Sequence, residues 1–364
     1  IVRSRLADAS KMVRYAAFRI ACASVRLEDA KAARNVADLL QRIRHEGDQV
    51  RGHVLKSLEG LLLTPPHAKA ALERLMQVVV ELGASDQALR DLFKTHRAAH
   101  DPQTFAVSMK SLADTIVSQL LTEKGQSPDA KSLSMLLEHI SAECPGAVHA
   151  HIATLQRWMV LRAGMPKCDL LLAKEACRVL SNALPSWVEQ TSASLVQPVG
   201  QNIQDLLSKI LESQELGLVR AATECLCIVA PKVLVNTDQL LEHFSRNFAQ
   251  LRDVVEQRLP LDAPTQERVC RLAWIVASML EFVDAGVLPP EAARVCGGQH
   301  PKGLVGAVLW LLCTFCLNGP PAMRPLLVPC VGFVLRHHAA FLHAREGPYK
   351  VLEAGLIGGG AGGA

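Results

Sequence analysis

The sequence predicts an all-α protein in which antiparallel helix pairs stack one after another, the architecture of an α-solenoid. Hydrophobic residues make up 49% of the 364 residues, whereas aromatic residues make up only 4%. Alanine and leucine, both strong helix formers, supply much of the apolar content. Runs of alternating β-branched residues, which would predict strands, are nearly absent. These observations favour helices along the whole chain.

A repeated Val-Arg pair supports the stacked arrangement. Val13-Arg14, Val50-Arg51 and Val219-Arg220 each stand near the start of a helical apolar pattern. Arg14 and Arg51 are 37 residues apart, and the 169 residues from Arg51 to Arg220 are close to four further steps of about 42. That step is the period of HEAT-type helix pairs, so we predict a HEAT-repeat α-solenoid, a fold that offers mainly a binding surface.

The individual helices follow from apolar spacing and from the residues that break it. Short turns that carry Gly, Pro, Ser or Asp separate the segments, as at Asp101-Pro102 and at Cys144-Pro145-Gly146. Connections this short predict antiparallel neighbours. The expected helices are 11–26, 29–45, 48–63, 67–82, 86–97, 103–123, 129–143, 146–163, 168–184, 188–213, 216–230, 237–257, 264–284, 302–318 and 322–343.

The domain organisation predicted from these segments is one solenoid over residues 1–357. The only long break, 285–301, contains Pro289-Pro290 and Gly297-Gly298, and we interpret it as a loop between repeats or a weak boundary. Residues 358–364 form a tail of glycine and alanine that predicts a flexible segment.

Charge is unevenly distributed. The net charge of the chain is +4, which by itself does not imply nucleic acid. The first 60 residues hold twelve basic and seven acidic residues, a net charge of +5, so the remainder is close to neutral. A basic first sixth of the chain indicates an acidic partner.

Cysteine content and hydropathy bear on the compartment. The eleven cysteines are odd in number, and most lie within apolar helical runs. This usage is typical of a reducing environment, where free cysteine acts as a small core residue. The most apolar window, 304–317, is shorter than a membrane span. We therefore expect a soluble intracellular chain, a piece of a larger protein, with no membrane partner.

Two groups of metal-ligating residues have simpler interpretations. Cys313 and Cys316 form a CxxC motif without a second Cys or His pair at zinc-site spacing, so we expect a core helix face. Arg336-His337-His338 with His343 predicts a solvated helix end, because cations there complement the helix dipole.

The basic group Lys94, His96, Arg97 and His100 has the same interpretation, with a phosphate-contacting patch as its alternative. No phosphate-binding loop, dinucleotide motif, HExxH or GxSxG occurs. The sequence supports neither catalysis nor a cofactor.

Basic residues along the first predicted repeats are the candidate DNA-binding residues. Basic side chains repeated along one edge of a solenoid would follow a phosphate backbone, and the alternative is an ordinary solvated face. For Arg14 and Arg51 a structural role, pairing with an Asp of the neighbouring repeat, is equally compatible with the sequence. The candidates are Lys11, Arg14, Arg19, Arg42, Arg44, Arg51 and Lys56.

Several segments, read in order, carry a resemblance to a known family. They begin with an Asp/Ser turn before a Val-Arg helix at 6–27, and then Gly47-Asp-Gln-Val-Arg-Gly running to an apolar-Thr-Pro stop at 61–65. The later segments are 174–185, Asp205-Leu-Leu, 219–230, Phe244-Ser-Arg-Asn-Phe248 and Arg271-Leu-Ala-Trp-Ile-Val-Ala-Ser-Met-Leu. This series resembles the large HEAT-repeat subunit of the cohesin loader, the Nipped-B-like family, over most of residues 6–345.

The resemblance implies a nuclear, chromatin-associated protein without an active site of its own. It implies binding to double-stranded DNA and to the cohesin complex through its ATPase heads and kleisin, with stimulation of the cohesin ATPase during loading. The smaller loader subunit would bind through a region that this chain lacks. No short motif of the family assigns these contacts to residues here.

Two other classes are compatible with the sequence. One is a different HEAT-type scaffold: a condensin-type subunit, a nuclear transport receptor or a phosphatase scaffold. A strongly acidic inner surface would favour the transport receptor, whereas a basic edge in the first two repeats favours a loader or condensin subunit. The other is an all-α enzyme with a metal site built on Cys313, Cys316 and histidines.

Overall fold

The computed structural model describes residues 2–25, 32–64, 68–82, 87–122, 130–283 and 303–338. Within these ranges every regular element is a helix and no strand occurs, so the all-α prediction is confirmed. The segment 285–301 and the tail 358–364 lie outside the described residues, and the interpretations given to them stay predictions.

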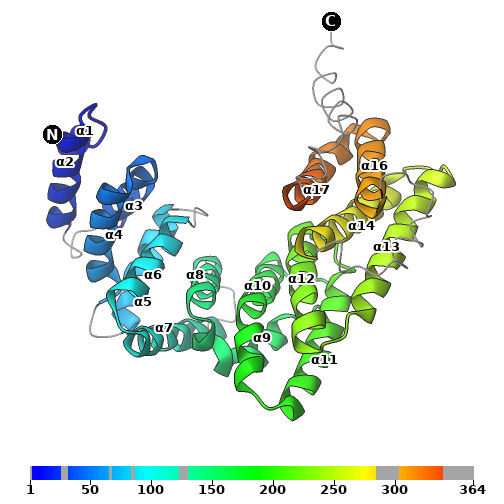
Figure 1. Cartoon of the computed structure of the whole chain (residues 1–364), viewed down its shortest axis with the longest axis horizontal. Helices are drawn as coiled ribbons and strands as arrows, with labels where there is room; N and C mark the ends of the chain where they lie inside the picture. Colours follow the sequence, from blue (N-terminus) through cyan, green and yellow to red (C-terminus); the bar gives the residue numbers. More distant parts are fainter. Residues whose placement is uncertain are drawn as a thin grey trace, which may run out of the picture. The chain divides into compact units, whose positions relative to one another are not determined.

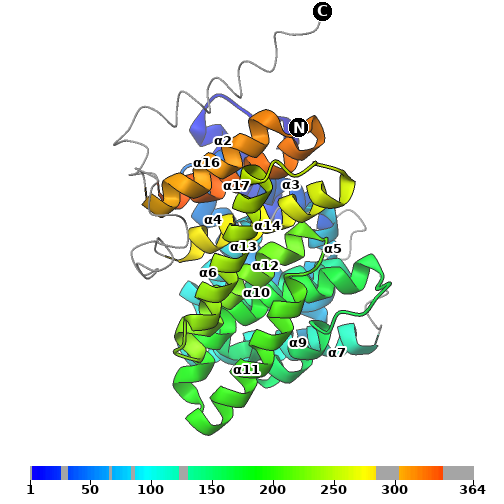
Figure 2. The ribbon, with the colours of Figure 1, turned by 90° about the vertical axis from the view of Figure 1, so that its right-hand side faces the viewer.

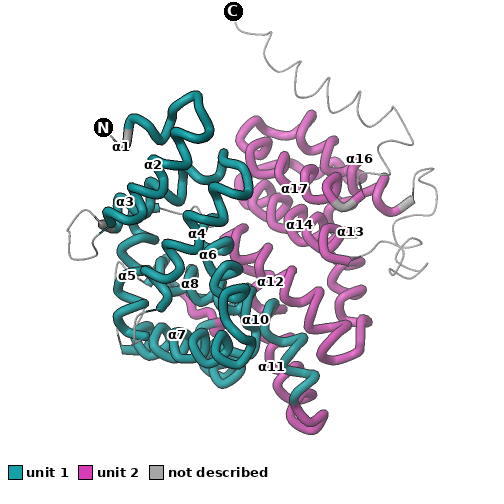
Figure 3. The backbone as a smooth tube through the Cα atoms, turned by 60° about the vertical axis from the view of Figure 1, so that its left-hand side comes forward, with its two compact units in different colours: residues 1–158, 164–190 teal, residues 159–163, 191–364 magenta. Residues whose placement is uncertain are grey.

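The chain divides into two compact units (Figure 3). Unit 1 comprises residues 1–158 and 164–190, and unit 2 comprises residues 159–163 and 191–364. The boundaries between the units follow residues 158, 163 and 190. The sequence shows no linker composition at these positions.

Unit 1 is built of two layers of helices (Figure 1). In one layer each helix packs against the next, from α2 to α4, α6, α8 and α10; in the other, α3 packs on α5 and α5 on α7. The first layer contains α2 (Lys11–Ser24), α4 (Asp48–Leu62), α6 (Gln87–Ala99), α8 (Ala130–Glu143) and α10 (Lys167–Gln190). The second contains α3 (Ala32–Arg42), α5 (Ala68–Leu82), α7 (Pro102–Thr122), the 3₁₀ segment η2 (Pro145–His151) and α9 (Ile152–Trp158). Two short elements complete the unit, α1 (Val2–Arg5) and the 3₁₀ turn η1 (Ile43–His45).

Unit 2 repeats the scheme with three helix pairs, which Figure 2 brings toward the viewer. Within the pairs α11 packs on α12, α13 on α14 and α16 on α17, and between them α12 packs on α14 and α14 on α17. The helices are α11 (Ala193–Ile210), α12 (Leu216–Ile228), α13 (Asp238–Glu256), α14 (Ala263–Phe282), α16 (Gly303–Asn318) and α17 (Arg324–His337). The single-turn elements η3 (Val229–Val233) and η4 (Pro321–Met323) follow α12 and precede α17.

The apolar faces predicted from the sequence form the cores of both units. Leu58 and Leu62 of α4 are 1% and 0% exposed. In unit 2 the rings of Phe244 and Phe248 stack on α13, and both side chains are buried. Burying each such side chain stabilises the fold by roughly 1.5–3 kcal/mol, which is how short helices of modest intrinsic stability persist.

Three predicted helix boundaries are wrong, and all three lie near prolines. The expected helix 146–163 is instead η2 followed by α9, because Pro145 and Gly146 start a tighter turn. The expected end at 184 before Pro185 does not occur. Helix α10 continues to Gln190, since a proline removes one backbone hydrogen bond while the flanking turns stay packed on α8 and η2. The next helix consequently begins at 193 and not at 188.

Candidate functional site

The Val-Arg arginines of unit 1 form ion pairs with the neighbouring helix pair. Arg14 and Arg51 are each the fourth residue of their helices, α2 and α4. The Arg14 guanidinium donates to both carboxylate oxygens of Glu46, at 2.6 and 3.2 Å, and to the backbone carbonyl of Asp8 at 2.9 Å. Its hydrogen bond to Glu46 raises the pKa of Arg14. Arg51 donates to Asp91 of α6. The predicted pairing with an Asp of the neighbouring repeat is therefore present for Arg51, whereas Arg14 binds a glutamate, Glu46, in the turn before α4.

A third member of this series was missed from the sequence. Arg90 is the fourth residue of α6, and it donates to Glu138 of α8 at 3.2 Å. Leu89-Arg90 is the same apolar-Arg pair with leucine in place of valine, 39 residues after Arg51, so the spacing could have identified it. We call the pairs Arg14–Glu46, Arg51–Asp91 and Arg90–Glu138 the arginine ladder of unit 1.

Unit 2 places the corresponding arginine in a different environment. Arg220 of α12 donates to both oxygens of Glu281 on α14, at 3.1 and 2.9 Å. Its guanidinium also lies 4.1 Å from the centre of the Phe333 ring on α17. Arg336 of α17 donates to the same carboxylate at 3.1 Å. Two arginines from two helices therefore share one carboxylate, whose side chain is only 8% exposed.

These contacts correct the prediction of a solvated helix end at residues 336–338. Arg336 is largely exposed but bound to Glu281, and the His338 imidazole lies 3.1 Å from the carbonyl oxygen of Leu280 through Nε2. Both residues thus fasten the end of α17 to α14. The side chain of His337 and residue His343 are outside the described part of the chain.

The other candidate DNA-binding residues remain on the surface. Lys11 and Arg19 of α2, Arg44 of η1 and Lys56 of α4 are all exposed. Arg42, also exposed, donates to Asp38 one turn earlier on α3 at 2.9 Å. The structure therefore separates the seven candidates: Arg14 and Arg51 hold neighbouring helix pairs together, and the other five present their charge outward.

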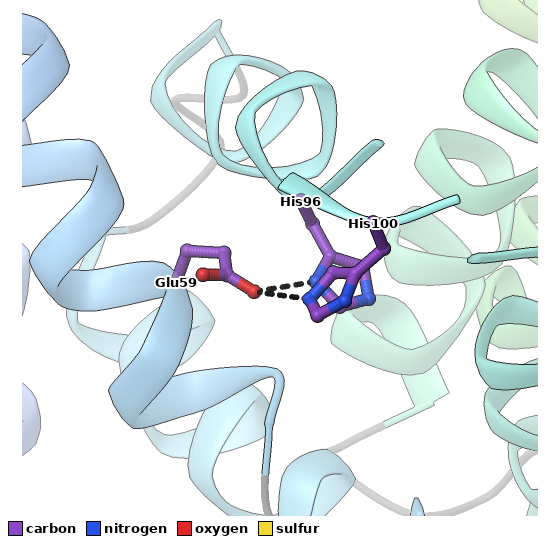
Figure 4. A group of neighbouring side chains, drawn as sticks. All are labelled: Glu59, His96 and His100. Atoms are coloured by element: carbon purple, nitrogen blue, oxygen red, sulfur yellow. Dashed lines mark hydrogen bonds and ion pairs between the residues drawn. The ribbon is translucent and has the colours of Figure 1, made fainter. Parts of the chain in front are cut away.

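A buried polar cluster joins α4 to α6 (Figure 4). One oxygen of Glu59, Oε1, lies 2.6 Å from Nδ1 of His96 and 3.2 Å from Nε2 of His100. Thr64 donates to the same oxygen at 3.3 Å. The side chains of Glu59 and His96 are 7% and 3% exposed, and that of His100 is 27% exposed. This cluster corrects the interpretation of residues 94–100 as a solvated basic group, because its two histidines face a carboxylate beneath the helix.

The charge states of the cluster follow from its surroundings. Burial raises the pKa of the Glu59 carboxyl, but hydrogen bonds from His96 and His100 outweigh it, so the pKa lies below its usual value. Burial lowers the pKa of His96 more than the Glu59 hydrogen bond raises it. At neutral pH the cluster therefore contains a carboxylate and a neutral His96 imidazole.

Several cysteines of unit 2 have pKa values raised by burial. Burial raises the pKa of Cys270 and of Cys313 to about 11, and it also raises the pKa of Cys316 and Cys330. Thiols of this kind stay protonated at neutral pH and are poor nucleophiles and metal ligands. Among the residues that the structure describes, the group with metal-ligand spacing contains Glu59, His96 and His100, and no cysteine.

None of the helices in the described ranges combines the length and the apolar character required to cross a membrane.

The fold and its ion pairs define the class of protein: an α-solenoid of HEAT-type helix pairs. A solved structure with the same fold is the carboxyl-terminal fragment of the Chaetomium thermophilum cohesin loader SCC2. It is similar at a TM-score of 0.68 and 15% sequence identity, over 97% of this chain. This chain spans 26% of the length of that fragment. That solved structure is a cohesin loader, the class of protein that the ordered sequence segments resemble, and at 15% identity the likeness shows a shared fold alone.

Other comparisons add less. Two structures of importin beta cover 100% and 98% of this chain at 12% identity, with a TM-score of 0.39. No family model matches the chain, and no curated protein matches it.

Proposed function

We propose that this chain is part of a cohesin loader and works as a non-enzymatic, chromosome-associated scaffold. The observation that carries the proposal is the similarity of its fold to the cohesin loader fragment over 97% of the chain. The ordered series of sequence segments between residues 6 and 345 supports the same family independently of the coordinates. A loader of this kind acts in the nucleus on chromatin.

DNA binding is proposed for the exposed basic residues of unit 1. Lys11, Arg19, Arg44 and Lys56 present their charges outward on α2, η1 and α4, and Arg42 adds a fifth charge beside Asp38. Such side chains bind phosphates without reading sequence, and release of counterions makes the affinity depend on salt. Arg14 and Arg51 contribute to this surface mainly by fixing the helices that carry it.

The proposed partner of the scaffold is the cohesin complex. Binding the ATPase heads and kleisin more tightly in their closed arrangement than in their open one would shift the heads toward hydrolysis. The chain would stimulate the ATPase in this way without contributing a reacting group. The smaller loader subunit would bind a region outside this chain.

Fluorescence anisotropy across a salt series tests the DNA-binding proposal. We expect the chain to bind an arbitrary duplex with a Kd of about 10⁻⁴ to 10⁻⁶ M near physiological salt, and more tightly at low salt. Replacing Lys11, Arg19 and Lys56 together with Glu should reduce the slope of log K against log salt by roughly three, if each contacts one phosphate.

A matched control has the same change in charge elsewhere on unit 1. Lys69, Lys131 and Lys167 are exposed residues of α5, α8 and α10, and replacing them with Glu should leave the slope nearly unchanged. Equal losses in both triple variants would show that only net charge matters. Stimulation of purified cohesin's ATPase by the chain, with and without duplex DNA, tests the partner separately.

A further inference from the structure

The Glu59, His96 and His100 cluster has the composition and spacing of a metal site. One ligand atom from each residue lies within 4.8 Å of the others; Glu59 belongs to α4, His96 to the adjacent helix α6, and His100 follows the last residue of α6. Figure 4 shows the two imidazoles projecting from the end of α6 toward the same carboxylate oxygen of α4. We propose that Glu59, His96 and His100 bind a zinc ion that links α4 to α6.

The distances fit zinc with a small adjustment. Ligand atoms held about 2.0–2.1 Å from a tetrahedral zinc ion lie roughly 3.3 Å apart. Glu59 Oε1 and His100 Nε2 are already 3.2 Å apart. Glu59 Oε1 and His96 Nδ1 are 2.6 Å apart and would separate by about 0.7 Å, which rotation of the two side chains can supply.

The close approach of three ligand atoms is what a shared cation would explain. Nδ1 of His96 and Nε2 of His100 both lie within hydrogen-bond distance of the one oxygen Oε1 of Glu59. Coordination through Nδ1 would move the proton of His96 to Nε2 and give the lone pair of Nδ1 and the carboxylate a common cation. Nε2 of His96 is buried without a hydrogen-bond partner among the described residues, with or without the metal.

The chemistry of the donors selects the type of metal. Two imidazole nitrogens and one carboxylate oxygen suit zinc and similar transition metals, whereas magnesium and calcium require sets of oxygens. Three protein ligands leave a fourth position, and the partial exposure of His100 gives water access to it.

The proposal does not depend on the proposed function, because a zinc ion here would stabilise the stacking of two helix pairs in any solenoid. Binding to the folded chain only would raise its stability in proportion to the logarithm of free zinc over Kd. The effect should be local: amide exchange should slow in α4 and α6 and stay unchanged in unit 2.

The test uses the whole chain, freed of metal by a chelator and then titrated with zinc. We expect about one zinc per chain after dialysis, a higher Tm with zinc and no change with magnesium. Cobalt in place of zinc should give the visible bands of a tetrahedral nitrogen and oxygen site, without the near-ultraviolet band of a cobalt–thiolate bond. A thiolate band would assign the metal to cysteines and overturn the proposal.

Variants decide between this site and adventitious binding. His100→Gln removes a partly exposed ligand with little risk to folding. It should weaken zinc binding by more than the roughly 10- to 100-fold that loss of an outer-sphere partner causes. Glu59→Gln should have the same effect. His151→Gln is the matched control, since His151 forms a 2.7 Å pair with Asp114 in the same unit but has no second imidazole. Zinc affinity unchanged in His100→Gln, or lowered equally in His151→Gln, would overturn the proposal.

Discussion

The two units stack their helices in the same way but join them with different ion pairs. In unit 1 each arginine of the ladder binds its own carboxylate: Arg14 binds Glu46 in the turn before α4, Arg51 binds Asp91 of α6, and Arg90 binds Glu138 of α8. In unit 2 two arginines from different helices converge on Glu281, and one of them also stacks on Phe333.

This difference determines how many helices lose stability when one ion pair is removed. Pairs that share no partner contribute independently to stability, whereas residues bound to one common group are coupled. We infer that a substitution in one ladder pair of unit 1 destabilises only the helix pairs which that ion pair joins. Unit 2 depends on a single buried carboxylate that joins α12, α14 and α17, so one substitution there affects three helices.

The largest effect is expected from Glu281→Gln. Removing this charge leaves Arg220 beside Phe333 with no carboxylate, and breaking a largely buried pair costs several kcal/mol. Because both arginines can still reach water, we expect a loss of about 2–3 kcal/mol in unit 2. Hydrogen exchange of peptides from α12, α14 and α17 measures this loss of stability in the three helices. Glu267→Gln, at an exposed position of the same helix, is the control and should change stability by less than about 0.5 kcal/mol.

Double-mutant cycles test the coupling directly. Arg51→Met and Arg90→Met should each cost on the order of 1 kcal/mol in unit 1, and the double variant should equal their sum within about 0.5 kcal/mol. Arg220→Met and Arg336→Met should deviate from additivity by more than that, because both bind Glu281. Additive losses in both units would remove the distinction drawn between them.

A pH dependence should distinguish the last pair of the ladder. Burial raises the pKa of Glu138. Hydrogen bonding from His139 and the charges of Arg90 and Arg178 lower that pKa by more than burial raises it, so it lies below its usual value near 4.5. The unfolded chain therefore takes up this proton first, and the stabilisation by Glu138 is lost as pH falls below about 4.5. Urea unfolding between pH 3 and 6 should show a shallower decline for Glu138→Gln than for the wild type. Glu189→Gln, at an exposed position of α10, should retain the wild-type slope.

The smallest effect on stability is expected from Arg42→Met. Its partner Asp38 is one turn away on α3, both side chains are partly exposed, and such pairs contribute about 0.3–0.5 kcal/mol. DNA affinity should nevertheless fall measurably if Arg42 belongs to the basic surface. A stability loss as large as that of Arg51→Met would show that Arg42 also belongs to the connections between helix pairs.

The sequence predicted the fold class well because helical periodicity is a local property. The spacing of Val-Arg pairs predicted the helix-pair period and left a structural role for Arg14 and Arg51 as one of two equal interpretations, beside DNA binding. A residue at a fixed helix position meets an equivalent neighbour in each pair. Arg90 was missed only because leucine precedes it. The helix expected after Pro145 was wrong because Pro145 and Gly146 start a tighter turn, and the end expected at Pro185 was wrong because packing by neighbouring helices overrides the local effect of that proline.

The buried cluster could not be predicted in this way. Glu59 and His96 are 37 residues apart, and their contact depends on the register between α4 and α6, which no local pattern encodes. The histidines also lie beside Lys94 and Arg97, so composition suggested a solvated surface. A histidine at position 96 within the apolar series Leu89, Leu92 and Phe93 was the available sign that its side chain points inward.

The arginine ladder also constrains how such a chain can change in length during evolution. Each of its arginines is the fourth residue of a helix and binds the helix pair that follows. A duplication or deletion of a whole helix pair would supply every arginine with an acidic partner again, and the new boundary would resemble the old ones. Gain or loss of a single helix would place a helix of the second layer where an arginine of the first layer needs its acidic partner. Lineages of this fold should therefore differ in size by complete pairs.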